Sequence, residues 1–379
     1  MNADFLPPPG GQGMRERAKM TKIPALIGTT ARYNALGTDN TGNVLHAIAA
    51  RNLLQDHVEF PTSREWTPED LEKIEGHSHI VIVMANAVRL GRDTNPLAPH
   101  HEIMRRNIER TTRPVVVFGL GAQAPYGGET SYRTPPETLN LLKVISERSR
   151  RIAVRGEFTA DTLRIMGIDN PEVIGCQSCF LSREPEFPHD LVNLAPERTK
   201  AVFNYTSMMT EKKLIKTAVE NGLDMVGQIE VYEAHAKEGV PYDLGKDVKK
   251  FQDMLAYFGI SEEQYAAYCR LHFSRFADLD TWLKHMRQYR FSFGTRFHGN
   301  MFALQAGTPS LWVVHDERTR ELCKFLNLPQ ISLEKALELN DVGKLREKVD
   351  YSEFLKTYPE RYRRLKAYVQ DAGLAHRLN

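Results

Sequence analysis

The chain has 379 residues, a formal net charge of +2, 41% hydrophobic residues and 26% charged residues. This length exceeds what one hydrophobic core usually supports, so we expect two domains. The small, interspersed charge argues against nucleic-acid binding, and the longest apolar runs are too short to cross a bilayer.

The N-terminus is rich in Pro and Gly and contains no apolar segment of the kind found in secretory signals. We therefore expect residues 1–22 to form a flexible tail and the protein to be cytoplasmic.

From residue 24, β-branched apolar runs alternate with segments of helical periodicity. The expected strands are 24–29, 79–85, 114–121 and 151–156, and the expected helices are 42–54, 138–149 and 157–167. Continuous apolar strands that alternate with amphipathic helices indicate a parallel sheet with helices on both faces.

The polar segment 182–200 is predicted to be a linker, after which the alternation starts again. The expected strands are 200–206, 224–232, 271–276 and 308–315, and the expected helices are 210–221, 246–258, 278–290, 316–326 and 351–373. This pattern predicts an α/β, GT-B-like fold in which two doubly wound Rossmann-type domains face an interdomain cleft. The predicted divisions are 23–190, 191–349 and a C-terminal helix, 350–379, and ligands should collect at the carboxyl ends of the strands.

The sequence GTRFHGN, 294–300, is the most informative stretch because it joins an expected strand to an expected helix. Arg296, His298 and the free N–H groups of the helix N-terminus could form an anion site with a histidine able to deliver a proton. Asn300 is a further candidate binding residue. The alternative is an arginine paired with a surface acid and a histidine that caps the helix.

The loop after the first strand holds a second group of candidates, Asp39, Asn40 and Gly42. Gly42 would let the backbone approach a ligand closely, and Asp39 is the one carboxylate available there as a base. Turn formation and helix capping are the alternative roles.

A glycine-rich loop follows the third expected strand, with Gly121 and Gln123 as candidate binding residues. Ala124 stands where a dinucleotide fingerprint needs its third glycine, and the sequence contains no GxxxxGK[ST] phosphate loop. A loop that closes over substrate is the better interpretation.

Two further candidates end strands. Arg155 lies at the end of the expected strand 151–156, where it could bind a ligand or pair with Glu157 or Glu129, and His315 ends the expected strand 308–315. Asp316 is expected to be the N-cap of the next helix.

The cysteines Cys176 and Cys179 have the CxxC spacing, but no second pair completes a zinc site. The segment IGCQSCFL is predicted to be a strand with its exit loop, so we favour a structural or substrate-loop role over redox chemistry.

Taken in order, these motifs resemble the polysaccharide pyruvyl transferase family. The resemblance rests on NTGN (40–43), GLGAQ (119–123), AVRGEFTADTLRIMGI (153–168), IGCQSCFL (174–181) and the block 294–329. Asn43 replaces an acid that is common in the family, and GCQS, with Cys176 and Gln177, replaces a GDP-type turn.

The resemblance implies transfer of the pyruvyl group of phosphoenolpyruvate to two hydroxyls of a sugar, which forms a cyclic ketal and releases phosphate. It implies that Arg296 and Arg155 bind the donor, that His298 protonates the enol carbon or the departing phosphate, and that Asp39 activates the acceptor. No metal and no cofactor besides the donor substrate are expected.

Alternative functions are a GT-B glycosyltransferase that uses a nucleotide sugar, and a non-catalytic homologue that binds a sugar or phosphate. Expected partners are phosphoenolpyruvate and a sugar or lipid-linked oligosaccharide acceptor, without nucleic acid. Acceptor contacts are expected in the loops 86–101 and 123–135, which include Arg89, Arg92, His100, His101, Tyr126 and Tyr132. Peripheral contact with the inner face of the membrane and homo-oligomer formation stay open.

Overall fold

The computed structural model describes residues 23–30, 33–91, 94–125, 131–191, 198–206 and 211–379. The expected tail, 1–22, and the acceptor-loop residues Arg92 and Tyr126 lie outside this part of the chain.

The first half of the chain builds a parallel sheet. Its elements are β1 (Ala25–Gly28), α1 (Asn43–Leu53), β2 (Val58–Glu59), α2 (Pro68–Glu75), β3 (Ile80–Val83), β4 (Val88–Arg89), α3 (Ala98–Glu109), β5 (Val115–Phe118), β6 (Ala122–Gln123), α4 (Pro136–Arg148), β7 (Ile152–Val154), α5 (Glu157–Ile165), β8 (Pro171–Val173) and the 3-10 helix η1 (Gln177–Phe180). The sheet order is β2-β1-β3-β5, and a bridge between Leu120 and Val154 brings the pair β7-β8 beside β5. The order reverses between β1 and β3, so ligand sites are expected where these two strands end.

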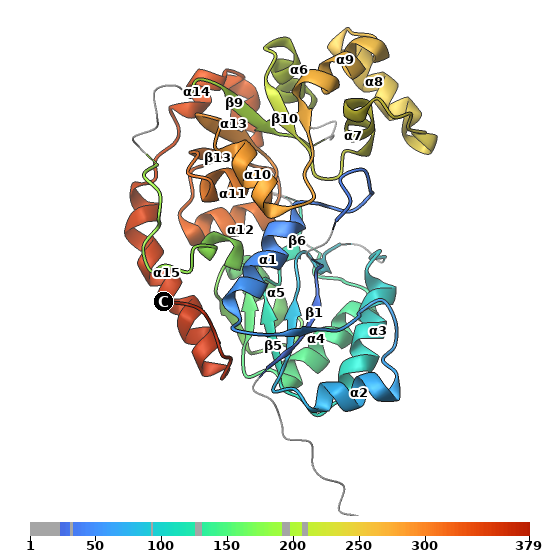
Figure 1. Ribbon diagram of the computed structural model, residues 1–379, viewed down its shortest axis with the longest axis vertical. Coiled ribbons are helices and arrows are strands. Elements are labelled where there is room, and N and C mark those ends of the chain that lie inside the picture. Colours follow the sequence, from blue (N-terminus) through green and yellow to red (C-terminus); the bar gives the residue numbers. More distant parts are fainter. Residues whose placement is uncertain (1–22, 31–32, 92–93, 126–130, 192–197, 207–210) are drawn as a thin grey trace, which may run out of the picture.

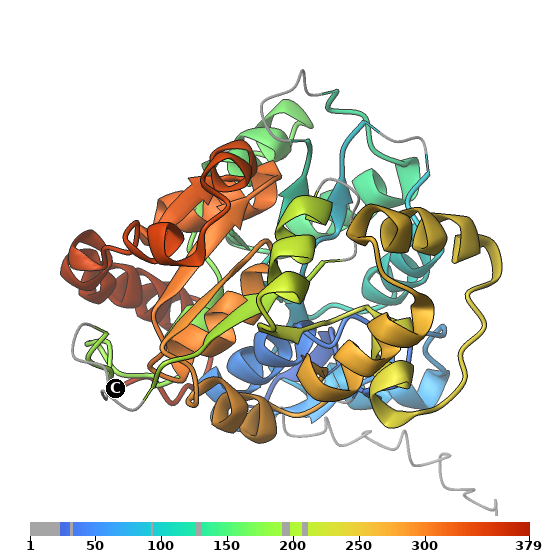
Figure 2. The same ribbon diagram turned by 90° about the horizontal axis from the view of Figure 1, so that it is seen from above.

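The second half builds a six-stranded parallel sheet. Its elements are β9 (Ala201–Asn204), α6 (Lys212–Glu220), β10 (Asp224–Val226), α7 (Val231–Glu238), α8 (Val248–Phe258), α9 (Glu262–His272), β11 (Phe273–Ser274), α10 (Leu279–Met286), β12 (Phe291–Gly294), α11 (Phe297–Gln305), β13 (Ser310–Val314), α12 (Glu317–Leu326), β14 (Gln330–Ser332), α13 (Leu333–Leu339), α14 (Val342–Arg346) and α15 (Ser352–Asp371). The order β11-β10-β9-β12-β13-β14 is the Rossmann order 3-2-1-4-5-6 when the strands are numbered within this half. Its switch point lies between β9 and β12. Helices flank this sheet, as the view from above shows (Figure 2).

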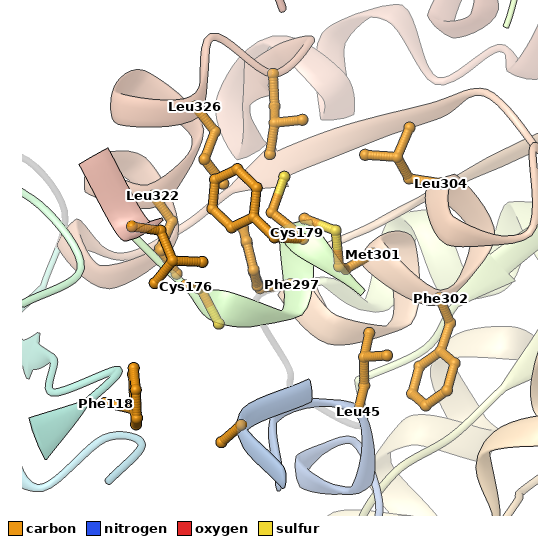
Figure 3. Close-up of a cluster of buried hydrophobic side chains, with 14 of the residues drawn as sticks. Leu45, Phe118, Cys176, Cys179, Phe297, Met301, Phe302, Leu304, Leu322 and Leu326 are labelled. Atoms are coloured by element: carbon orange, nitrogen blue, oxygen red, sulfur yellow. The ribbon is translucent and has the colours of Figure 1, made fainter. Parts of the chain in front are cut away.

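Alternate residues of the strands enter different cores, as the two-residue period of a strand requires. In β3, Ile80 and Ile82 face a core that belongs to the first half, whereas Val81 and Val83 face a second core. This second core also receives Trp312 of β13, so the inner faces of both sheets share it. Figure 3 shows its middle, where Leu45 of α1, Cys176, Cys179 and helices of the second half meet. The fold is therefore α/β and GT-B-like, as predicted, with its two halves joined by a continuous core.

The C-terminal helix α15 returns to the first half (Figure 1). The Tyr368 hydroxyl donates to the Val117 carbonyl of β5 at 2.9 Å, and the Tyr368 ring packs edge-on against Phe118. Near its end, Asp371 pairs with Arg151. The helix thus contributes to the shared core and covers part of the first sheet.

Two local predictions were wrong. The segment 224–232 is not one strand, because β10 ends at Val226 and α7 begins at Val231. The turn between them is held by Glu230, whose carboxylate accepts from the Gln228 and Ile229 backbone N–H groups at 2.7 and 2.9 Å. The segment that contains Cys176 forms the 3-10 turn η1 rather than a strand.

No helix among the described residues is long and apolar enough to span a membrane.

Candidate active site

A cavity of about 1280 Å³ lies between the two halves. Its walls come from the ends of β1 and β3 in the first half and from the segments after β9, β12 and β13 in the second half. Both switch points therefore open into the same cavity, which is where doubly wound sheets bind their ligands.

Arg155, directly after β7, lines this cavity. The residue is only 2% exposed, and its guanidinium Nε and Nη2 have no hydrogen-bond partner among the described residues. The predicted alternative, a pair with Glu157 or Glu129, has no support from the described contacts, and Glu129 lies outside them. Gly121 makes room for this side chain, because a Cβ there would lie 2.8 Å from Arg155 Cδ. A buried cation with unused donors is a site for an anion.

His298 lines the cavity from the first turn of α11 and is 8% exposed. Its Nε2 lies 3.7 Å from the Cys176 Sγ, and its ring centroid lies 5.7 Å from that of His46. Burial, together with His46, Arg155 and Arg318, lowers the pKa of His298 well below its ordinary value. At neutral pH this imidazole is therefore neutral and carries a single N–H proton.

Arg296 is the N-cap residue of α11 and also lines the cavity. Its Nη2 donates to the Glu230 carboxylate at 2.6 Å, and its Nε donates to the Tyr205 carbonyl at 3.2 Å. Although burial opposes ionisation of Glu230, Arg296 and two backbone N–H groups hold its pKa below the ordinary value. Arg296 thus pairs with a buried acid rather than with the surface acid of the alternative interpretation.

Residues directly after β13 contact the first half of the chain across the cavity. Asp316 is the N-cap of α12, as predicted, because its carboxylate accepts from the Thr319 backbone N–H at 2.8 Å. The same side chain accepts from Gln123 of the first half at 3.3 Å and lies 3.2 Å from Arg318 Nη2. Gln123, His315 and Arg318 line the cavity together with Asp316. This cluster fixes the position of Gln123 across the cavity.

The loop after β1 forms another wall. Asp39 is exposed and lines the cavity, and Asn40, also in the lining, accepts from the Gly42 backbone N–H at 3.0 Å in a local turn. Gly42 itself is packed against the second half, since a Cβ there would lie 2.1 Å from the Gln228 Oε1. Its lack of a side chain serves contact between the halves rather than contact with a ligand.

Asn300 faces away from the cavity. Its amide donates to the Gly294 carbonyl at 2.8 Å and accepts from Asn204 at 2.7 Å and from Ser292 at 2.9 Å. These contacts tie α11 to β9 and β12. The structure therefore places Asn300 where it supports the loop that carries Arg296, and not among the residues that line the cavity.

Of the candidate acceptor residues, Arg89, His100 and His101 line the cavity. Burial lowers the pKa of His100 and of His101, the latter to about 4, so both rings are neutral at neutral pH.

Sequence reasoning did not identify two residues that contact His298, His46 and Cys176, nor Gln177, which contacts His46. His46 is fully buried in α1, and its ring contacts the Gln177 amide. Cys176 and Gln177 belong to the segment for which a substrate-loop role was one of two interpretations. The signal that could have identified them is a polar residue inside an otherwise apolar stretch: His46 next to Leu45, and Gln177 shortly after Ile174.

Among the described residues no cluster of three or more His, Cys, Asp or Glu side chains could hold a metal ion.

Comparison with known proteins identifies one family. The sequence model described as "Polysaccharide pyruvyl transferase" matches residues 40–317. No curated protein sequence matches the chain.

Several solved structures are similar to this chain at low identity. A putative UDP-N-acetylglucosamine 2-epimerase from Listeria monocytogenes is 14% identical over 93% of this chain and 96% of its own, with a TM-score of 0.41. The Methanocaldococcus jannaschii UDP-GlcNAc 2-epimerase is 12% identical over 91% and 99%, with a TM-score of 0.42. Anabaena HepE, solved with UDP and glucose, is 9% identical over 92% and 95%, with a TM-score of 0.48. Likenesses at this level do not bear on the chemistry of the cavity.

Proposed function

The chain belongs to the polysaccharide pyruvyl transferase family, and on that premise we propose that it transfers the pyruvyl group of phosphoenolpyruvate to hydroxyls of a sugar or polysaccharide precursor. The product is a pyruvate ketal, phosphate is released, and the modified glycan enters exopolysaccharide or cell-surface biosynthesis. The reaction uses phosphoenolpyruvate as donor substrate and needs no other cofactor.

The observation that carries this proposal is Arg155, a buried guanidinium with two unused nitrogens in the wall of a large cavity. Phosphoenolpyruvate carries a phosphate and a carboxylate, and both match the planar donor geometry of arginine. Burial and the positive charge of Arg318, which lines the same cavity, lower the pKa of Arg155, so a bound anion would offset both effects. The donor then lies beside His298, whose pKa the same two arginines lower.

Arg296 acts from the other side of the cavity. Because its guanidinium is already fixed by Glu230 and Tyr205, it offers a rigid positive charge at the second-half switch point. In this proposal it binds the remaining acidic group of the donor. His298 gives its proton to the enol carbon or to the departing phosphate, which is general acid catalysis.

The acceptor sugar occupies the rest of the cavity. A three-carbon donor fills a small part of 1280 Å³, which leaves space for at least one sugar ring. Asp39 and Asn40 from one loop and Gln123 from another offer oxygen and amide groups to its hydroxyls. We assign to Asp39 the role of base for the attacking hydroxyl. A lipid-linked acceptor would bring this cytoplasmic protein to the inner face of the membrane.

The test is ketal formation by the full chain. Wild-type protein with phosphoenolpyruvate should release phosphate only when a glycoside acceptor is present, and mass spectrometry should detect the ketal. The variant His298→Ala should lower kcat by at least about 100-fold because a general acid is lost. His57→Ala, a histidine outside the cavity, is the matched control and should keep full activity.

A thermal-shift comparison distinguishes the alternative donor class. Stabilisation by phosphoenolpyruvate and not by nucleotide sugars is expected. If a nucleotide sugar stabilises the protein while phosphoenolpyruvate does not, the proposed reaction is wrong and a glycosyltransferase is favoured. Phosphate release that is absent with every glycoside of a broad panel would favour a non-catalytic binding protein.

A further inference from the structure

The environment of His298 poses a chemical problem for a proton donor. The ring is buried, and its charged or titratable neighbours from the surrounding elements are His46 of α1, Arg155 after β7 and Arg318 of α12. All three disfavour an imidazolium ion. Among the described residues no carboxylate hydrogen-bonds this ring, although carboxylates commonly stabilise catalytic histidines in the charged form.

The group that the protein does supply is a thiol. Cys176 Sγ lies 3.7 Å from His298 Nε2, within the range of a sulfur hydrogen bond, and 3.0 Å from the Ser178 Oγ. Cys176 is fully buried and belongs to the cluster drawn in Figure 3. Arg155 interacts electrostatically with this sulfur. The thiol therefore lies between a ring nitrogen, a hydroxyl and a cation that has unused donors.

The contact between Cys176 and His298 accommodates either tautomer of the ring, and a thiol that donates to the ring defines one of them. A neutral imidazole that accepts the Cys176 S–H at Nε2 must carry its own proton on Nδ1. Nε2 is the nitrogen that the described residues bind, which leaves Nδ1 for a ligand in the cavity that His298 lines.

We propose that Cys176 is a positioning residue that exchanges a proton with His298, so that the ring can give a proton to the substrate without becoming cationic. This inference rests on the proposed function and specifies how its acid works. The Nδ1 proton moves to C3 of phosphoenolpyruvate while the thiol proton moves to Nε2. The thiolate that results is stabilised by the Ser178 hydroxyl and by Arg155.

The protons balance over the cycle. The first acceptor hydroxyl bonds to C2 of the donor and gives its proton to Asp39. The proton then returns to Nδ1 of His298, and the Nε2 proton returns to the thiolate. The C2–O bond to phosphate then breaks, the second hydroxyl forms the second C–O bond of the ketal, and its proton leaves with the phosphate. No oxidant, metal or further reactant is needed.

The direct test does not depend on turnover. In the free full-length protein labelled with ¹⁵N-histidine, two-bond NMR correlations report which ring nitrogen carries the proton, and His298→Asn assigns the signal. We expect a neutral His298 protonated at Nδ1 in the wild type and a shift toward the Nε2-protonated form in Cys176→Ala. Cys179→Ala, on the same turn and equally buried, is the matched control and should leave the tautomer unchanged.

Kinetics separate proton exchange from simple packing. Cys176→Ser keeps a donor to Nε2 and hence the tautomer, but an alcohol is a far weaker acid than a thiol. We expect Cys176→Ser and Cys176→Ala each to lower kcat by about 100-fold with an unchanged KM for phosphoenolpyruvate, whereas Cys179→Ala should retain wild-type kcat. Circular dichroism confirms that each variant is folded.

Three results would overturn the inference: a wild-type His298 that is protonated at Nε2 or at both nitrogens, a tautomer that is unchanged in Cys176→Ala, or a Cys176→Ser variant with wild-type kcat. If the wild type forms no ketal with any acceptor, the proposed function fails, and the NMR measurement alone decides whether Cys176 controls the ring.

Discussion

Arg155 and Arg296 come from different halves, and each follows a parallel strand and lines the same cavity. Their surroundings differ. Arg296 is held by Glu230 and by the Tyr205 carbonyl, whereas two nitrogens of Arg155 have no partner among the described residues. The Nε and Nη2 groups of Arg296 already have partners within the protein, whereas Arg155 has nitrogens that an anion could bind. The comparison shows that a position at a strand end does not by itself decide whether an arginine binds a ligand. A hydrogen-bonded acid beside the arginine, such as Glu230, decides it.

The largest expected effect concerns the stability contributed by Arg296. Arg296→Met removes the guanidinium partner of Glu230, a carboxylate whose side chain is fully buried. Losing one member of a buried ion pair should lower the free energy of unfolding by about 3–5 kcal/mol, measured by denaturant unfolding. Arg287→Met, at an exposed position, is the control. If Arg296→Met is as stable as Arg287→Met, the pair between Arg296 and Glu230 does not stabilise the fold, and the contrast with Arg155 is lost.

Replacement of Arg155 should change the free energy of unfolding in the opposite direction. Arg155→Met removes a buried cation whose Nε and Nη2 have no hydrogen-bond partner among the described residues and whose burial opposes its charge, so the free energy of unfolding without ligand should rise by about 1 kcal/mol. The dissociation constant for phosphoenolpyruvate, measured by calorimetry, should increase about 100-fold because charge-assisted hydrogen bonds are lost. Arg151→Met, which breaks contacts with Glu172 and Asp371 near the surface, should leave this affinity unchanged. An unchanged affinity in Arg155→Met would remove Arg155 from the donor site.

The last prediction tests the acidic surroundings of Arg296. Burial raises the pKa of Glu211 to about 8, and its carboxylate accepts from the Thr295 hydroxyl at 2.7 Å. A raised pKa means that the folded state holds the proton more tightly. This stabilisation is fully present below the ordinary carboxyl pKa and is lost as pH rises through about 8.

Glu211→Gln should therefore reduce the pH dependence of the free energy of unfolding over that range, by at most about 1.4 kcal/mol per pH unit. Unfolding curves at a series of pH values measure it. Glu220→Gln, at an exposed position, should leave the dependence as it is in the wild type. A pH dependence that is the same in Glu211→Gln and the wild type would mean that Glu211 is ionised in the fold.

The sequence predicted the arginines because their signal is local. Arg155 and Arg296 each stand between a β-branched or aromatic run and a helix start, and a parallel sheet brings such positions to one edge. The alternation of apolar strands with amphipathic helices, which starts again after the expected linker, also predicted the two-sheet fold. Asn300 shows where local reasoning fails, because it is two residues from His298 in α11. Two residues turn a helix by about 200°, so the side chains of His298 and Asn300 point in opposite directions.

Partners distant in the sequence could not be predicted. Glu230 is 66 positions before Arg296, and Cys176 is 122 positions before His298. Such pairs depend on how the two sheets are packed against their shared core, and no local periodicity specifies that packing. The division between a paired and an unpaired arginine was therefore accessible only from the structure.

The path of α15 has a mechanical consequence. The chain passes from the first half to the second after η1 and passes back before α15, whose Tyr368 is anchored on β5. Any opening of the cavity to admit a glycan would therefore have to bend both crossings, and removal of α15 would leave a single covalent connection between the halves.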